Sequence, residues 1–408
     1  MVHNLRNIRI KYMKAIIKIL LIPLIIVSCH SSINKEQSII RTFDLKELPK
    51  ISEVKLSDLG FVDIKYIPLE TNDSCLFSCP NNLIWPGKLI VGDRFYVVKL
   101  GNNVLMFKDN GSFVKKIGTV GRGPNEYMVA HDVQFNERDR EIYLLSGWQS
   151  KFFIYSIWGE LIRMFQIPFF CTEFNFVEDG ILCYSENHTG NIEKSYNLID
   201  IDGEILKSYS NKYPFHFHDG YVFKGENLFY RFNDQVFKKE VYSDTVYLYK
   251  DGEFKSNLVI NVGDKLITPD ARSQFDGQYL AKNFINPLNL FEFGKYVYYE
   301  FMYKFDFSNQ EIYSFIGSTN NDFMVLFNTD QGIVNDIDGG PNMQPKTTTD
   351  DNTIIGWIDA IKLKNHVASD AFKNSTPKYP EKKKELEKLA NSLKDTDNPV
   401  LILVSMKK

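Results

Sequence analysis

Short hydrophobic stretches separated by tight turns recur along the chain. Four of them pair two hydrophobic strands around a glycine-containing turn, with the turn glycines at Gly111, Gly159, Gly203 and Gly252. These glycines are separated by 48, 44 and 49 residues. Glycine supplies the positive φ that two-residue hairpin turns require. The pattern therefore predicts a repeated β-hairpin.

Further strands fill the intervals between these hairpins. The ranges 88–99, 133–145 and 174–184 each contain two hydrophobic strands around a turn. A fifth copy of the repeated hairpin is predicted over 303–315, with Asn309 in its turn. Several short strands per repeat, at this repeat length, are typical of the blades of a β-propeller.

The two ends of the repeating region also carry hydrophobic strands, at 61–69 and 400–406. In propellers the two ends of the chain often share one blade, which removes a free sheet edge. The region between these strands is long enough for about six blades at propeller repeat lengths. The sequence therefore predicts an all-β fold, a six-bladed β-propeller of four-stranded blades, over residues 55–408.

One segment breaks the strand pattern. Residues 380–393 are rich in charged residues, and Leu386, Leu389 and Leu393 follow one another at three- and four-residue steps. This spacing places the three leucines on one face of a helix. We expect a short helical insertion just before the closing strand, with its charged face in solvent.

The first 28 residues differ from the rest in charge. They contain five basic residues and no acidic ones, and an apolar run over 19–27 that is too short for a transmembrane helix. This arrangement is typical of a secretory signal peptide. The run ends in Ile26-Val27-Ser28-Cys29, which resembles the lipobox of bacterial lipoproteins.

That resemblance implies that Cys29 is lipidated and becomes the N-terminus of a membrane-anchored protein. Residues 29–54 would then form the lipidated N-terminus and a tether. His30 follows the cysteine, and no aspartate there indicates retention in the inner membrane. We therefore expect an outer-membrane lipoprotein, with the periplasmic and cell-surface sides both left open.

Charge and cysteine usage narrow the possible partners. Removing the first 28 residues takes away five positive charges, so the formal net charge moves from −3 to about −8. This balance argues against a nucleic-acid partner. Of the remaining cysteines, Cys171 and Cys183 are expected to be free buried thiols, while Cys75 and Cys79 could close a small loop. Without a CxxC pair a structural zinc site is not expected.

A glycine-rich loop follows the first hairpin. Residues 118–127 read GTVGRGPNEY, and the loop resembles one in the six-bladed β-propeller lipoproteins of Bacteroides-type bacteria, relatives of NHL-repeat propellers. The opening strand VDIKYIPLET, the late loop NDIDGGPNMQP and the closing DNPVLILVSMKK are similar to that family as well. The resemblance implies the propeller fold and export as a lipoprotein, but it supplies no set of catalytic residues.

Several residues are candidates for ligand binding. In the glycine-rich loop, Arg122 could pair with Glu126 or face the central channel. Pro124 removes a backbone donor and no helix pattern follows, so the loop is not expected to bind phosphate. Trp148 lies in a predicted loop between strands, where it could pack against the core or a neighbouring blade, or stack on a sugar.

Two metal motifs also need consideration. His216 and His218 lie two residues apart and would point to one side of a strand, but no third metal ligand is identifiable. Asp336 and Asp338 are similar to the start of a calcium loop that lacks its later glutamate. We therefore expect neither a metal ion nor a cofactor.

Two classes of function remain. The first is a binding module for a glycan, a peptide or another envelope protein. The second is a lyase or hydrolase that acts on a polysaccharide or peptide, with its site at one mouth of the central tunnel. A cluster of ionisable side chains with shifted pKa values at a tunnel mouth would favour the enzyme. An apolar or aromatic patch on one face would favour the binding module.

Overall fold

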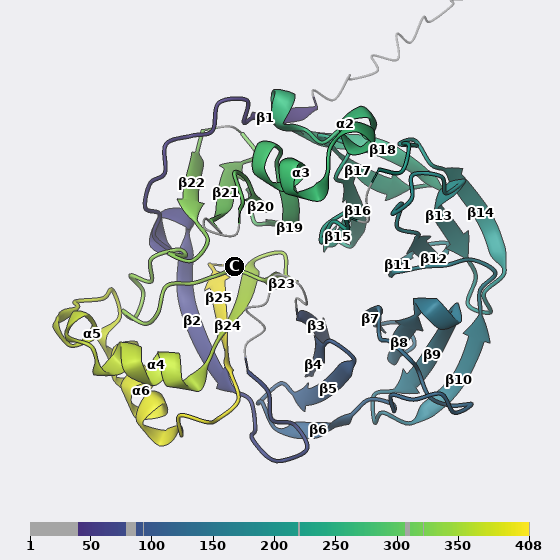
Figure 1. Ribbon diagram of the computed structural model, residues 1–408. Coiled ribbons are helices and arrows are strands. Elements are labelled where there is room, and N and C mark those ends of the chain that lie inside the picture. Colours follow the sequence, from purple (N-terminus) through teal and green to yellow (C-terminus); the bar gives the residue numbers. More distant parts are fainter. Residues whose placement is uncertain are drawn as a thin grey trace, which may run out of the picture. The chain divides into compact units, whose positions relative to one another are not determined.

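The computed structural model describes residues 40–78, 87–92, 94–218, 221–306, 311–320 and 322–407. These residues form six sheets arranged as blades around a central axis (Figure 1). Each blade contains four antiparallel strands, and successive strands run from the axis outward. The predicted all-β, six-bladed propeller of four-stranded blades is therefore confirmed.

Five of the six blades consist of four consecutive strands each. Their bounds are β3 (Lys88–Gly92), β4 (Phe95–Leu100), β5 (Asn103–Lys108) and β6 (Phe113–Lys116); β7 (Asp132–Asn136), β8 (Glu141–Ser146), β9 (Lys151–Ser156) and β10 (Leu161–Gln166); β11 (Glu173–Val177), β12 (Gly180–Tyr184), β13 (Lys194–Ile199) and β14 (Ile205–Ser210); β15 (Asn227–Phe232), β16 (Gln235–Glu240), β17 (Thr245–Lys250) and β18 (Glu253–Asn261); and β19 (Asn286–Phe293), β20 (Tyr296–Met302), β21 (Ile312–Ser318) and β22 (Met324–Asn328).

The sixth blade joins the two ends of the ring. Its strands are β23 (Thr347–Asp350), β24 (Thr353–Ile358), β25 (Val400–Met406) and, outermost, β2 (Phe61–Pro68). Strand β2 pairs antiparallel with β25, from Phe61 opposite Met406 to Pro68 opposite Val400. The expected sharing of one blade by both ends is therefore observed.

An additional strand lies before β2 in the sequence and joins the fourth blade. Strand β1 (Arg41–Asp44) pairs in parallel with β18 and gives the fourth blade a fifth strand. We expected the propeller domain to begin at residue 55, yet Phe43, Leu45 and Val54 are already buried in the core. We call residues 41–54 the strap. Its few buried apolar residues attach this largely polar segment to the ring.

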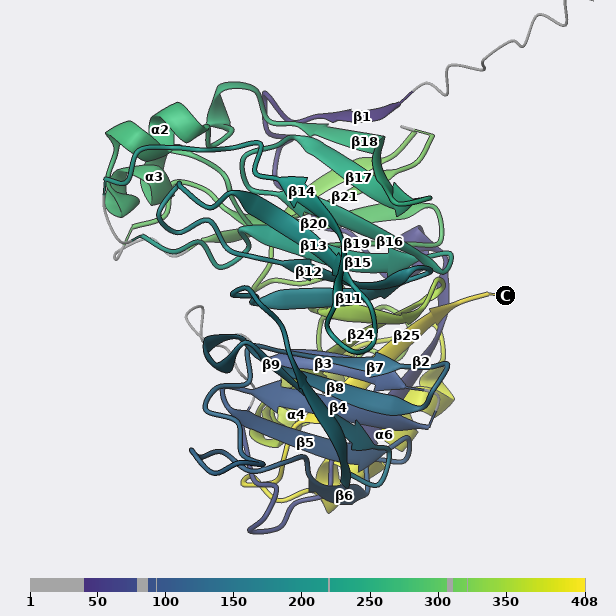
Figure 2. The ribbon, with the colours of Figure 1, turned by 90° about the vertical axis from the view of Figure 1, so that its right-hand side faces the viewer.

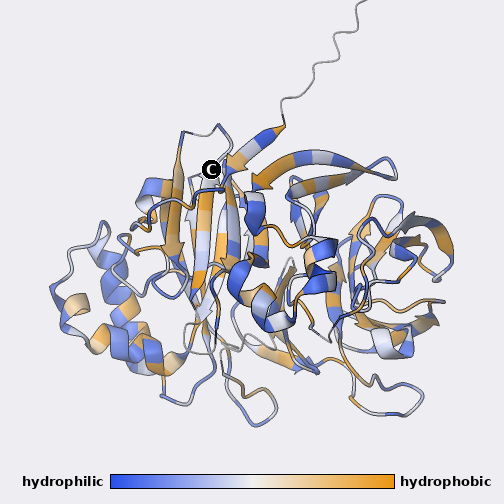
Figure 3. Cartoon of the chain, turned by 45° about the horizontal axis from the view of Figure 1, so that its top comes forward, coloured by the Kyte–Doolittle hydropathy of each residue, from blue (hydrophilic) through white to orange (hydrophobic). Residues whose placement is uncertain are grey.

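Helices occupy a few of the connections. They are η1 (Ser57–Leu59), η2 (Gly147–Gln149), η3 (Gly263–Lys265), α2 (Pro269–Gln274), α3 (Gly277–Asn283), α4 (Ala360–Ala368), α5 (Asp370–Asn374) and α6 (Pro380–Ser392). Helix α6 confirms the predicted insertion before the closing strand, and α4 and α5 belong to the same insertion. Leu386 and Ala390 of α6 are buried, while its remaining surface is largely hydrophilic (Figure 3).

The core lies between the faces of neighbouring blades. Figure 3 shows hydrophobic and hydrophilic residues alternating along the strands, as expected when side chains point to opposite faces in turn. The rings of Phe152 in the second blade and Phe174 in the third lie 4.9 Å apart, edge to face. Aromatic contacts of this kind fill the space between two sheets efficiently.

The predicted fifth hairpin is wrong in its place within the blade. The first four hairpins join the third and fourth strands of their blades, whereas 303–315 connects β20 to β21, the second and third strands. The corresponding hairpin of the fifth blade joins β21 to β22. Every antiparallel hairpin has the same hydrophobic pattern, so the pattern does not specify which two strands it joins.

Candidate functional site

The strand order places two kinds of connection at one end of the ring. The innermost strands all begin at this end, so the connections between blades and those between second and third strands also lie there. We call this end the upper face. Helices α2 and α3, which connect the fourth blade to the fifth, mark it on the left of Figure 2.

All described candidate residues lie in upper-face connections. Arg122 and Glu126 connect β6 to β7, Trp148 is in η2 between β8 and β9, and His216 and His218 connect β14 to β15. The side chains of Arg122, Trp148 and both histidines are exposed. The structure thus gathers these residues on one face without bringing all five into contact. Cys29 lies outside the described residues.

The glycine-rich loop uses its glutamate for its own structure. The Glu126 carboxylate accepts a hydrogen bond from the backbone N–H of Gly123 at 2.8 Å, and a Cβ atom at Gly121 would collide with it. The buried Tyr127 hydroxyl donates to the carbonyl of Asn102 at 2.9 Å. Of the two alternatives for Arg122, the ion pair with Glu126 is not formed among the described residues, because Glu126 folds back onto its own loop.

Trp148 belongs to a group of three rings that we call the aromatic shelf. The ring of His131 lies 5.7 Å from that of Trp148 and 6.0 Å from that of Phe170, edge to face in both pairs. Trp148 is 67% exposed. The N–H of Gly147 donates to Nδ1 of His131 at 3.0 Å, so the neutral ring carries its proton on Nε2. Burial lowers the pKa of His131, which favours this neutral form.

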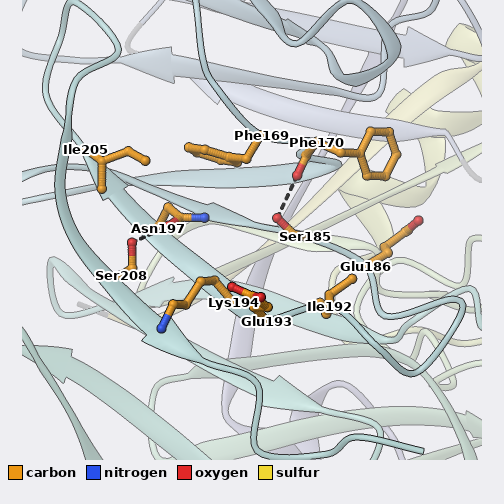
Figure 4. Close-up of a pocket in the computed structure, with 10 residues that line it drawn as sticks. All are labelled: Phe169, Phe170, Ser185, Glu186, Ile192, Glu193, Lys194, Asn197, Ile205 and Ser208. Atoms are coloured by element: carbon orange, nitrogen blue, oxygen red, sulfur yellow. Dashed lines mark hydrogen bonds between the residues drawn. The ribbon is translucent and has the colours of Figure 1, made fainter. Parts of the chain in front are cut away.

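A pocket of about 380 Å³ adjoins the shelf at Phe170 (Figure 4). Its lining combines apolar side chains with hydroxyl, amide and charged groups. The lining residues are Phe169, Phe170, Ser185, Glu186, Ile192, Glu193, Lys194, Asn197, Ile205 and Ser208.

Hydrogen bonds hold the polar side of this pocket in place. Ser185 Oγ donates to the carbonyl of Phe170 at 2.6 Å, and Ser208 Oγ donates to Asn197 Oδ1 at 2.7 Å. In the view of Figure 4, the apolar side chains of Phe169 and Ile205 lie above Asn197 and Ser208. The pocket can therefore contact an apolar surface and hydrogen-bonding groups of the same ligand.

A second polar group lies where the innermost strands of the blades begin, around the axis of the ring. The innermost strand of every blade begins with a polar residue, and we call these residues the mouth ring. They are Lys88, Asp132, Glu173, Asn227, Asn286 and Thr347. Their positions follow from the ring itself, because the innermost strands are parallel neighbours around the axis.

Short polar contacts join two pairs of residues of the mouth ring. Lys88 Nζ lies 2.6 Å from Asp132 Oδ1, and Asn227 Nδ2 donates to Glu173 Oε2 at 3.0 Å. The Tyr196 hydroxyl donates to Asn227 Oδ1 at 2.8 Å. Burial raises the pKa of Glu173 to about 8, and the negative charge of Asp132 adds to this effect. Glu173 therefore holds a proton near neutral pH.

A second carboxyl group with a raised pKa belongs to Glu226, the residue just before β15. Glu226 is only 2% exposed, and burial raises its pKa to about 8, with a contribution from Glu186. The backbone N–H of Asn187 donates to the Glu226 carboxylate at 3.1 Å. His188 Nε2 lies 2.6 Å from Glu186 Oε2, and this contact raises the pKa of His188. The mouth therefore combines groups that can donate and accept protons.

The sequence-level metal and thiol predictions can be compared with the described residues. These residues contain no cluster of three or more potential metal ligands. Asp336 accepts hydrogen bonds from Ser57, whereas Asp338 contacts Tyr66, so the two aspartates do not converge on one site. Cys171 and Cys183 are free and buried, as predicted. Cys75 is also a free buried thiol, and Cys79 lies outside the described residues.

Sequence reasoning did not identify the mouth ring or the pocket. A polar residue at the start of a strand is ordinarily assigned to the preceding turn, and only the closed ring brings six such positions together. The recurrence of a polar residue at each strand start was the available signal. The pocket had no comparable signal in the sequence. Strand β14, which forms part of its wall, has no buried side and exposes five of its six residues.

Two solved structures resemble the chain, and the one with the higher TM-score agrees with this fold. A crystal structure of a Bacteroides fragilis protein named "putative exported protein" is similar to the chain, with a TM-score of 0.65 and 18% identity over 88% of this chain and 98% of that one. A Bacteroides vulgatus member of the DUF4221 family matches with a TM-score of 0.45 and 12% identity, over 66% of this chain and 88% of that one. No curated protein sequence matches the chain.

Two further observations complete the comparison. In the part of the chain that the structure describes, none of the helices has the length and apolar character needed to cross a membrane. The family model described as a domain of unknown function, DUF4934, matches residues 40–405 and thus nearly the whole described ring. The chain therefore belongs to the DUF4934 family.

Proposed function

We propose that this protein is an exported, lipid-anchored β-propeller that binds a glycan on its upper face. The observation that carries the proposal is the aromatic shelf, with its exposed Trp148, directly beside the amphipathic pocket. The N-terminal signal and the lipobox-like Cys29 support export and anchoring, and the glycine-rich loop supports a relation to the NHL-like lipoprotein propellers.

The chemistry of the shelf and pocket suits a carbohydrate. A sugar ring has an apolar face of C–H groups and a rim of hydroxyl groups. Large exposed aromatic side chains such as Trp148 can cover the apolar face. The Asn197 amide and the Glu186 carboxylate, which line the pocket, can bond to hydroxyl groups. A few polar groups in a mainly apolar pocket are the usual means of orienting a ligand.

The first experiment measures glycan binding by isothermal titration calorimetry. Residues 40–408 are titrated with a panel of bacterial and host-type oligosaccharides, and then the Trp148→Ala variant is titrated with any sugar that binds. We expect the variant to lose at least tenfold in affinity, because the stacking surface is gone.

The chain provides a matched control for this test. Trp158 is 66% exposed and belongs to the same blade, but it lies in the turn between β9 and β10 at the opposite end of the ring. Trp158→Ala should therefore bind like the unsubstituted protein. Equal losses in both variants, or no binding of any oligosaccharide, would contradict the proposal.

A second candidate function rests on the mouth ring. Glu173, whose pKa is raised, lies beside Asp132, which is ion-paired with Lys88, and such a carboxyl group can act as a general acid. A hydrolase or lyase that acts on a polysaccharide or peptide could use such a pair. Turnover of such a polymer that is lost in Glu173→Gln would favour this enzyme over a binding module.

A further inference from the structure

A second pocket lies on the outer side of the sixth blade. It has a volume of about 310 Å³ and is enclosed by β2 and α6, the helix that is packed near β2 at the left of Figure 1. The upper-face pocket, by contrast, is lined by strands of the third blade and by the connections next to them. The lining residues of the second pocket are Asp63, Ile64, Lys65, Tyr66, Asp338, Lys382, Glu385, Leu386 and Leu389.

Asp338 is the most unusual residue of this lining. It is 0% exposed, and its Oδ1 atom accepts hydrogen bonds from Asn335 Nδ2 at 2.7 Å, from Gly340 N–H at 2.9 Å and from the Tyr66 hydroxyl at 3.2 Å. Its Oδ2 atom is buried and has no hydrogen-bond partner within the described ranges. A buried acceptor without a donor is costly, so this oxygen offers a strong contact to any donor that reaches it.

The nearest cation does not satisfy this oxygen. Lys382 Nζ lies 2.6 Å from Asp63 Oδ1 and is thus held at the edge of the pocket. The lining contains three carboxylates, from Asp63, Asp338 and Glu385, but only two ammonium groups, from Lys65 and Lys382. One further positive charge would therefore balance the charges of the pocket.

The rest of the lining is apolar. Leu386 is buried and Leu389 is half-buried on the α6 side of the pocket. Such a surface favours a ligand whose cationic group is carried on a hydrocarbon chain. A metal ion would gain nothing from these side chains.

We propose that this pocket binds a primary alkylamine in its ammonium form, with an N–H group donating to Asp338 Oδ2 and the alkyl chain lying against Leu386 and Leu389. The ammonium group supplies the missing donor and the missing charge together. The hydrocarbon chain covers the apolar part of the lining. This site is independent of the proposed glycan site.

The test uses n-hexylamine as the probe and calorimetric titration of residues 40–408 at neutral pH. Two related probes separate the contributions of charge and hydrogen bonding. Hexanol has the chain without the charge, and hexyltrimethylammonium has the charge without an N–H donor. We expect hexylamine to bind at least tenfold more tightly than either. Equal binding of hexanol would reduce the site to an apolar cleft and overturn the proposal.

Variants connect the binding to this pocket. Asp338→Asn removes the charge and should abolish binding, but it also disturbs contacts with Tyr66 and Asn335. Leu389→Trp fills the pocket and leaves those contacts in place, so it should weaken hexylamine binding at least tenfold.

The matched control is Glu387→Gln, on the exposed side of α6, which should bind hexylamine normally. Its effect is compared with that of Glu385→Gln, which alters the lining and should weaken binding severalfold. Undiminished binding in Leu389→Trp, or no binding of hexylamine to the unsubstituted protein, would overturn the proposal.

Discussion

At the scale of single residues, the ring gives new meaning to side chains that are ordinary in the sequence. Glu173 follows Cys171 and Thr172 and is the first residue of a strand, a setting in which a glutamate is usually assigned to the preceding solvated turn. In the fold it lies beside Asp132 and Asn227, which come from two other blades. Its raised pKa depends on these long-range neighbours and on burial, and no local pattern contains that information.

The raised pKa of Glu173 predicts a pH-dependent stability. In the unfolded chain its pKa is near the ordinary 4.5, and in the folded chain it is about 8. Between these values the folded state binds more protons, so its contribution to stability is full at low pH and falls as the pH rises toward 8. Glutamine cannot lose a proton. Glu173→Gln should therefore match the unsubstituted protein at pH 5 and be more stable by roughly 1–3 kcal/mol at pH 8.

Urea unfolding at the two pH values measures this difference. The control is Glu160→Gln, an exposed glutamate in the turn between β9 and β10. It should change the unfolding free energy by no more than about 0.5 kcal/mol at either pH. A Glu173→Gln variant that is destabilised equally at pH 5 and pH 8 would show that the carboxyl group is ionised throughout this range.

At the scale of elements, strands with a clear hydrophobic pattern could be predicted and short or irregular ones could not. The hairpins around Gly111, Gly159, Gly203 and Gly252 are present as predicted, and the structure shows that each joins strands three and four of its blade. Helices α2 and α3 have only six and seven residues, too few for a helical period to be recognised. Strand β1 has four residues and pairs with β18, more than two hundred positions away in the sequence.

The strap formed by β1 has an energetic role that can be measured. Phe43 is completely buried, and its ring lies 5.5 Å from that of Phe315. Gly317 leaves room for this ring, because a Cβ atom there would lie 2.5 Å from it. Phe43→Ala should lower the unfolding free energy by about 3–5 kcal/mol, as for other large core aromatics.

The neighbouring Ile40 provides the control for Phe43, since it is 43% exposed. Ile40→Ala should change the free energy of urea unfolding by less than about 0.5 kcal/mol. If Phe43→Ala unfolds at the same urea concentration as Ile40→Ala, the strap rests on the ring without stabilising it.

At the scale of the whole molecule, the candidate site depends on ring closure. Pairing of β2 with β25 fixes the six blades around one axis, and only then do the six strand starts form the mouth ring. The sequence could predict the blade number and the closing strands from repeat length and hydrophobic pattern. It could also place Arg122, Trp148 and His216 in loops, but which loops share a face follows from strand direction, and which side chains meet follows from the twist and packing of the blades.

The proposed anchor makes the last prediction, which concerns the full chain in a Gram-negative host. Acylated Cys29 would carry at least two hydrocarbon chains, enough for stable attachment to a bilayer. The unsubstituted protein should therefore sediment with membranes and incorporate an alkyne-labelled fatty acid, whereas Cys29→Ser should lose the label and leave the membrane fraction. Cys75→Ser controls for the loss of a thiol, because Cys75 is a buried residue of the ring. Membrane association that persists without the label in Cys29→Ser would mean that the protein attaches through a surface of the propeller instead.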